Sequence, residues 1–165
     1  MPPLLVGLAG WILPGLGYML IGEVRRGVMV CVAILGLFIG GLFVGGVRVV
    51  DVPGYGDDGQ RVLRADGRWT LTSAPLPTVL GKSWFVGQFL AGPVTLMAGA
   101  GSLQAAASGY PQATAHLREI ATLYCAVAGM LNLVVLIDAA HRSSAAREHL
   151  SRRGSSRRRP VGGGA

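Results

Sequence analysis

Four apolar stretches, each about as long as a lipid bilayer is thick, constrain the fold of this chain most. Residues 2–22, 27–47, 84–103 and 120–137 contain no Asp, Glu, Lys or Arg. Because an α-helix rises about 1.5 Å per residue, about 20 residues cross the ~30 Å hydrocarbon core of a membrane. A soluble helix of this length carries one polar face, and these stretches have none. The sequence therefore predicts an all-α membrane protein, folded as a four-helix transmembrane bundle.

The four stretches are expected to form two hairpins. Residues 1–47 are assigned to a first transmembrane hairpin, 48–83 to a polar loop, 84–138 to a second transmembrane hairpin, and 139–165 to a basic, partly disordered tail. Charged residues make up only 14% of the chain, whereas soluble domains contain about 25%. An apolar start is also typical of a cleaved signal peptide. No basic residue precedes the first stretch and a second one follows at once, which favours a retained hairpin.

Two adjacent close-approach patterns lie in the second stretch, Gly36-x-x-x-Gly40 and Gly41-x-x-x-Gly45. Glycines four residues apart share a helix face and leave a groove for another backbone. We expect another span of the same chain to fill this groove, with a homodimer as the second choice. In the first stretch, Pro14 predicts a kink, which either shapes the packing or frees carbonyl groups to form a pocket.

Polar side chains interrupt the later apolar stretches, and three of them are expected to bond between helices. Asn132 lies about two-thirds of the way along residues 120–137, where an unpaired amide is costly, so it is predicted to hydrogen-bond a neighbouring helix. Gln88 and Thr95 are seven residues apart, share a helix face, and are expected to bond across helices as well. The two cysteines, Cys31 and Cys125, are interpreted as packing residues, with a disulfide between spans as the alternative.

The polar loop carries a turn signal. Asp66-Gly67 separates two extended runs, residues 61–65 and 68–72, and this dipeptide is favoured in two-residue β-hairpin turns. The loop is therefore predicted to contain a short β-hairpin. Its acidic residues, including Asp57 and Asp58, lack the ligand spacing of a calcium loop, so no metal site is expected there.

Beyond residue 139 the chain is strongly basic. A run of this kind next to a span is attracted to anionic lipid headgroups, and nucleic acid is not expected as a partner because no aromatic platform accompanies it. The residues predicted to contact headgroups are Arg152, Arg153, Arg157, Arg158 and Arg159.

The distribution of Lys and Arg predicts the orientation in the membrane, because cytoplasmic segments are enriched in both. With four spans, the polar loop and the tail share one side and together hold twelve Lys or Arg residues, against three on the other side. Both termini are then cytoplasmic. In the alternative, the third stretch is re-entrant, three spans remain, and the balance falls to nine against six.

Two groups of motifs resemble known membrane families. Trp11-x-x-Pro14-Gly15-x-Gly17-Tyr18, and then Gly22-x-x-x-x-Gly27, resemble the first hairpin of small bacterial multi-pass proteins classed as a domain of unknown function. Ala128-Gly129-x-Leu131-Asn132-Leu133, followed by Asp138-Ala139, is similar to the last span of that family. The first hairpin is also similar to the two-transmembrane-helix domain, although Leu20-Ile21-Gly22 replaces its aromatic pair before the glycine. The resemblance implies a multi-pass protein and supplies no catalytic residue.

These observations favour a noncatalytic scaffold or accessory subunit in the bacterial inner membrane, with a membrane protein or a second copy as its partner. The alternative is a small oligomeric transporter or channel, with Asn132, Gln88 and the Pro14 kink lining the path. An enzyme is not expected, because the three histidines form no nucleophile–base pair or metal spacing. No cofactor and no metal are predicted.

Overall fold

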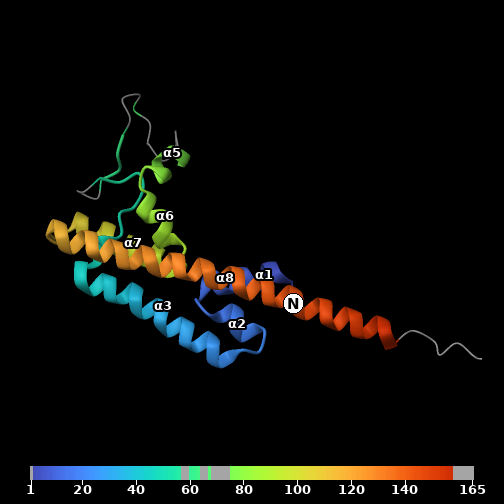
Figure 1. Cartoon of the computed structure of the whole chain (residues 1–165). Coiled ribbons are helices and arrows are strands. Elements are labelled where there is room, and N and C mark those ends of the chain that lie inside the picture. Colours follow the sequence, from blue (N-terminus) through green and yellow to red (C-terminus); the bar gives the residue numbers. More distant parts are fainter. Residues whose placement is uncertain (1, 57–59, 64–66, 68–74, 158–165) are drawn as a thin grey trace, which may run out of the picture.

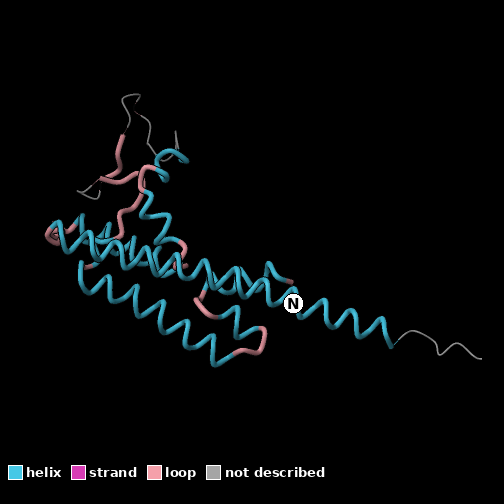
Figure 2. The backbone as a smooth tube through the Cα atoms, in the orientation of Figure 1, coloured by secondary structure: helices cyan, strands magenta, loops and turns pink. Residues whose placement is uncertain are grey.

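The computed structural model describes residues 2–56, 60–63, 67 and 75–157, and these are mostly helical (Figures 1 and 2). No strand occurs among them, and Tyr55 forms an isolated bridge with Arg61. The all-α prediction is therefore confirmed for the described residues. The elements are α1 (Pro3–Ile12), α2 (Leu16–Leu20), α3 (Val24–Gly45), η1 (Val47–Val49), α5 (Pro75–Leu80), α6 (Ser83–Phe89), α7 (Pro93–Ala107) and α8 (Ala115–Arg157).

Two long helices, α3 and α8, lie side by side in opposite directions (Figure 1). Near the end of α3, a Cβ added to Gly41 would lie 2.7 Å from Sγ of Cys125 and 2.9 Å from O of Ala121, so the two backbones approach closely there. Within the described residues, Val24–Gly45 and His116–Ala145 are the two helices long and apolar enough to cross a membrane. The prediction of four spans is therefore wrong.

The first apolar stretch falls short of a span because it folds back on itself. α1 ends at Ile12, Leu13 is extended, and Gly15 adopts a left-handed conformation with φ +86°. Pro14 lacks the N–H that a continuous helix needs, and glycine adopts positive φ without steric cost. A Cβ on Gly17 would lie 3.0 Å from O of Val6, so α2 returns along α1.

The third stretch is interrupted in a similar way between α6 and α7. Gly92 has a φ of +99° and Pro93 opens α7, so the helix stops after Phe89 and restarts in a new direction. Both outer ends of this segment lie near the start of α8. Lys82, before α6, binds Asp51, which also pairs with Arg118 of α8. This observation supports the re-entrant interpretation of the third stretch, but the first stretch is folded back as well.

The chain thus repeats one pattern twice, a folded-back helical hairpin followed by a long helix. The α1–α2 hairpin precedes α3 in the chain and lies beside the C-terminal half of α8 (Figure 1). The α6–α7 hairpin precedes α8 in the chain and lies beside the N-terminal half of α8. Because α3 and α8 are antiparallel, the two hairpins point toward each other from opposite ends. Inverted repeats with interrupted helices are a recurring architecture of membrane transporters.

Two further predictions concern the loop and the tail. The Asp66-Gly67 turn and its flanking runs lie largely outside the described residues, which contain no β-hairpin there. The tail is helical as far as described, because α8 continues without interruption to Arg157. The described residues of the loop and the tail lie at opposite ends of α8, whereas four spans would place both at the same end. The physical reason is that only two helices, α3 and α8, run the full distance between these ends.

Candidate functional site: the junction of two interrupted helices

The tips of the two hairpins meet beside α8. We call this place the hairpin junction and define it by the α1–α2 turn, the α6–α7 turn and Asn132. Nε1 of Trp11 in α1 donates a hydrogen bond to O of Phe89 in α6 at 3.2 Å. Nδ2 of Asn132 donates to O of Leu90 at 2.9 Å and, more weakly, to O of Gly10 at 3.5 Å. One amide of α8 therefore contacts the interrupted ends of both hairpins.

Two glycines allow the backbones to come this close. A Cβ on Gly129 of α8 would overlap O of Gly87 and lie 3.0 Å from N of Ala91. A Cβ on Gly92 would overlap O of Trp11, and the φ of Gly92 itself is positive. Any side chain at either position would force the hairpin tips away from α8 or from each other. The backbone carbonyl groups released by the helix breaks are thereby held within hydrogen-bonding reach of Trp11 and Asn132.

The junction also contains buried polar atoms without a partner among the described residues. Asn132 is 0% exposed and Gln88 is 1% exposed. Oδ1 of Asn132 accepts no hydrogen bond, and neither Nε2 nor Oε1 of Gln88 makes one. Buried polar groups are normally paired with protein or with ordered water, so these three unpaired atoms need a physical explanation.

A line of uncharged polar residues connects the junction with one end of the molecule. Oγ1 of Thr95 donates to O of Gln88 at 2.5 Å, and Thr95 is fully buried. Ser102, seven residues further along α7, is buried on the same helix face and lines a cavity of about 20 Å³ together with Asp51 and Arg118. A cavity of this size holds about one water molecule.

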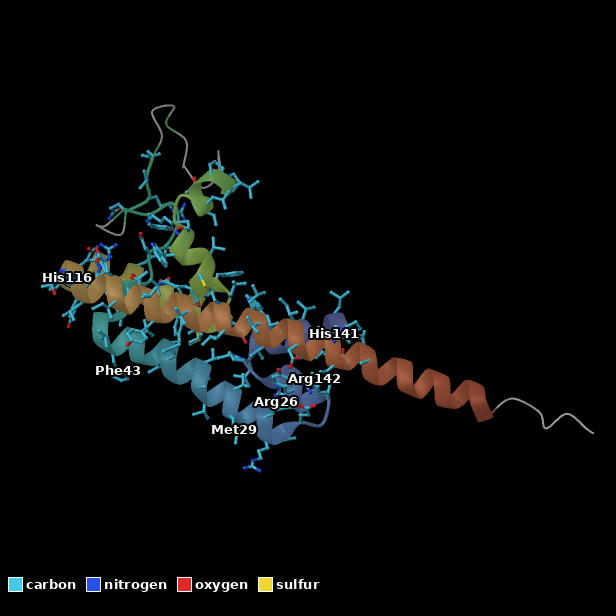
Figure 3. All side chains as sticks on the ribbon, viewed as in Figure 1. Arg26, Met29, Phe43, His116, His141 and Arg142 are labelled. Atoms are coloured by element: carbon cyan, nitrogen blue, oxygen red, sulfur yellow. The ribbon has the colours of Figure 1, made fainter. Side chains whose placement is uncertain are left out.

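A charged network lies at the opposite end, where α2, α3 and α8 meet. The hydroxyl of Tyr18 donates to Oδ2 of Asp138 at 2.5 Å, and Nε of Arg142 donates to the same oxygen at 2.8 Å. Arg26 lies 3.9 Å from Asp138 and 5.0 Å from the centre of the Tyr18 ring, and Glu23 pairs with both arginines (Figure 3). Burial, followed by the hydrogen bond to Asp138, raises the pKa of Tyr18 and keeps its hydroxyl available as a donor.

Sequence reasoning missed this network. Tyr18 and Asp138 are 120 positions apart, and no local pattern pairs them. The only sequence signal was the i, i+4 spacing of Asp138 and Arg142.

The end at which α8 begins carries a second group of charges. Nζ of Lys82 donates to Asp51 and to the backbone oxygens of Val52 and Tyr55 at 3.3 and 3.1 Å, while Arg118 lies 4.0 Å from Asp51. Two open clefts of about 630 and 750 Å³ occur near this end. Arg48, which donates to O of Tyr110 at 2.7 Å, lines the smaller of them.

The predicted glycine face of α3 is divided between two environments. Gly41 and Gly45 lie against α8, where added Cβ atoms would contact Cys125 and Ala121. Gly36 and Gly40 have no atom within 4 Å of such a Cβ, so their side of the helix is open. The structure therefore brings Asn132, Gly41 and Gly45 to contacts with other helices and leaves Gly36 and Gly40 uncovered.

The remaining candidate residues are placed as follows. Cys31 and Cys125 are both free, and Sγ of Cys125 contacts O of Phe38 at 3.5 Å, so the alternative of a disulfide is wrong. No group of three or more His, Cys, Asp or Glu residues that could hold a metal occurs in the described part of the chain. Arg152, Arg153 and Arg157 belong to α8, and Arg158 and Arg159 lie outside the described residues.

Residues 5–150 match a single family model. The chain belongs to DUF6677, a family of unknown function. No significant match to this chain was found among curated proteins or among solved structures. The family assignment agrees with the resemblance to a domain of unknown function and adds no activity to the geometry described above.

Proposed function

We propose that this protein is a noncatalytic integral membrane protein in which α3 and α8 cross the bilayer and the two hairpins are re-entrant. Support comes from how little of the apolar surface of the long helices is covered. Of the most apolar 18-residue segment of each helix, only 22% is buried in α3 and 33% in α8. The core helix of a soluble protein is mostly buried, whereas a lipid-facing helix leaves its apolar side chains exposed.

The spacing of the charged groups supports the same proposal. Arg118, with Asp51, and Asp138, with Arg142, are 20 positions apart on α8, which corresponds to about 30 Å of helix. This distance equals the thickness of the hydrocarbon core, so both charged groups lie at water interfaces in the proposed arrangement.

The helix interruptions are compatible with insertion at this depth. Irregular backbone within a membrane is tolerated where protein covers it and satisfies its polar groups. Trp11, Asn132 and Thr95 donate to carbonyl oxygens at the α6–α7 break, which meets this requirement there. Near the α1–α2 break, Asn132 also donates weakly to O of Gly10.

In this arrangement residues 46–118 lie on one side of the membrane, except where the α6–α7 hairpin enters it, and both termini lie on the other side. Nine Lys or Arg residues flank the spans on the terminal side, and six lie on the side of the polar loop. The enrichment of Lys and Arg in cytoplasmic segments then places both termini in the cytoplasm of a bacterial cell, with the protein in its inner membrane. The polar loop lies outside.

Within the membrane we assign a scaffold or accessory role, in which the uncovered side of α3 contacts another transmembrane helix. Gly36 and Gly40 are open, and Phe43 is 85% exposed. Figure 3 shows Met29 and Phe43 on the side of α3 that faces away from α8. Open glycine positions let a second helix approach closely, and a large side chain beside them offers it a contact. A second copy of the chain is the alternative occupant.

In-membrane photo-crosslinking tests the scaffold role. A photoreactive residue in place of Phe43 should crosslink to one defined protein in native membranes. The same residue in place of Val134, which is 63% exposed on α8, is the matched control and should label lipid alone. Absence of a protein crosslink from position 43, or equal crosslinking from both positions, would contradict the scaffold role.

A transport role is the second candidate, and the unpartnered amide atoms of Gln88 and Asn132 favour it. Polar sites between interrupted helices are where membrane transporters bind their substrates.

A further inference from the structure

The unpaired atoms at the hairpin junction define the chemistry of a molecule that would satisfy them. Gln88 offers one amide donor and one acceptor, and Asn132 offers a second acceptor. Gln88 and Asn132, and the Thr95 and Ser102 that lead to them, are all uncharged. A buried ion without a countercharge is costly in a membrane. The complementary ligand is therefore neutral and both donates and accepts hydrogen bonds.

The same region limits the size of this ligand and indicates its route. Because Gln88 and Asn132 are almost completely enclosed, a molecule that bonds to their amide atoms must be small. The 20 Å³ cavity beside Ser102 connects α7 with Asp51 and Arg118 at the end where α8 begins. From Ser102 to Thr95 the distance along α7 is about 10 Å. On the other side of Asn132, half-buried Val135 and Leu136 come before Asp138.

We propose that the hairpin junction is a binding site for water or an uncharged molecule of similar size, reached from the Arg118 end along the buried face of α7 that carries Ser102 and Thr95. The site rests on the proposed membrane insertion and is independent of the scaffold role. It explains why two amides remain in an otherwise apolar helix contact: their hydrogen bonds are completed by the bound molecule.

Oxidation of an introduced cysteine by hydrogen peroxide tests the site in protein reconstituted in lipid vesicles. Hydrogen peroxide is uncharged, hydrogen-bonding and close to water in size. The thiolate sulfur takes up one peroxide oxygen to give a sulfenic acid, the O–O bond breaks, and the second oxygen leaves as hydroxide. Because only the thiolate reacts, the rate reports whether water reaches the sulfur. Thr95→Cys reports on the junction, and Val134→Cys is a lipid-facing control close to Asn132 along α8.

We expect Thr95→Cys to be oxidised about tenfold faster, or more, than Val134→Cys and the native Cys125, as located by mass spectrometry of peptides. If Thr95→Cys is as slow as Val134→Cys, the hydrated site is refuted and the membrane insertion stands. If Val134→Cys is oxidised as fast as a cysteine in water, the insertion itself is refuted.

The melting temperature of Gln88→Met provides a second measurement, in case Thr95→Cys does not fold. Methionine has a similar shape and volume but cannot replace the hydrogen bonds of the amide. If the amide is satisfied by a bound molecule, the substitution lowers the melting temperature, because it removes those bonds. An unchanged or raised melting temperature would show that the amide is unsatisfied and would overturn the proposal.

Discussion

Replacing Asn132 by leucine tests whether this amide holds the two hairpins against α8. The substitution removes the bonds from Nδ2 to O of Leu90 and to O of Gly10. Hydrogen bonds between helices in membranes stabilise by about 0.6 kcal/mol on average and about 1.7 kcal/mol at most. The bond of 2.9 Å to Leu90 should contribute the usual stabilisation, and the bond of 3.5 Å to Gly10 should contribute little because it is long. Leucine also removes Oδ1 and the hydrogen bond that the proposed bound molecule gives to it, so we expect a net loss of about 1 kcal/mol.

The measurement is the free energy of unfolding in detergent micelles, with helix content followed by circular dichroism. Val134→Leu is the matched control, because position 134 is on the same helix, is 63% exposed and makes no polar contact. Asn132→Leu should unfold at lower denaturant concentration than the control, with retained helix content before the transition.

Trp11→Phe removes the other side-chain hydrogen bond between the hairpin tips, from Nε1 to O of Phe89. Because the two bonds secure the same junction, the double variant should lose less stability than the sum of the single losses. A stability of Asn132→Leu equal to or above that of the native chain would refute the reasoning. The tips would then be held by backbone packing and the Trp11 bond, without a contribution from Asn132.

Three further predictions follow from contacts described above. Gly129→Ala should destabilise the protein by about 1–3 kcal/mol, because its Cβ would overlap O of Gly87, whereas Gly36→Ala at an open position should be neutral or slightly stabilising in the same unfolding assay. Reporter fusions after Gly81 and Gly109 should report the outside and a fusion after Ala165 the cytoplasm; a cytoplasmic signal at Gly81 would contradict the two-span arrangement. Arg142→Gln should lower the stability only slightly, and the effect should disappear in high salt, because the ion pairs of Arg142 are half-exposed; Arg25→Gln, at an exposed position, is the control.

The helical class and the second span could be predicted from the sequence, because a charge-free run of this length has few other solutions. Residues 27–47 correspond closely to α3. The number of spans could not be predicted in the same way, since length and composition do not distinguish a helix that crosses from one that folds back. The distinguishing signals were Pro14-Gly15 and Gly92-Pro93, which place a residue with positive φ beside one without an N–H. Pro14 was interpreted as a kink, but Gly15 turns the chain back.

The sequence indicated which polar side chains belong to the candidate site, but it did not indicate their hydrogen-bond partners. Asn132 was expected to hydrogen-bond another helix, and in the structure it donates to O of Leu90 in the α6–α7 turn. This partner is a backbone carbonyl released by a helix break, and its identity depends on how two hairpins meet in space. Gln88 and Thr95 were expected to bond across helices, whereas Oγ1 of Thr95 bonds back across the break to O of Gln88. Because the helix is interrupted between Gln88 and Thr95, Thr95 bonds to a carbonyl of the preceding helix α6.

The unbroken course of α8 restricts what its basic end can touch. The helix has 43 residues, and Arg157 follows Arg142 by 15 positions, about 23 Å along a straight axis. At physiological ionic strength the attraction between exposed charges is screened within about 8 Å. If Arg142 marks the membrane surface, a straight α8 holds residues 152–157 beyond the electrostatic reach of the headgroups. Contact of Arg152, Arg153 and Arg157 with lipid therefore requires α8 to bend. An upright helix instead works as a spacer, which holds positive charge at a fixed height for an acidic surface in the cytoplasm.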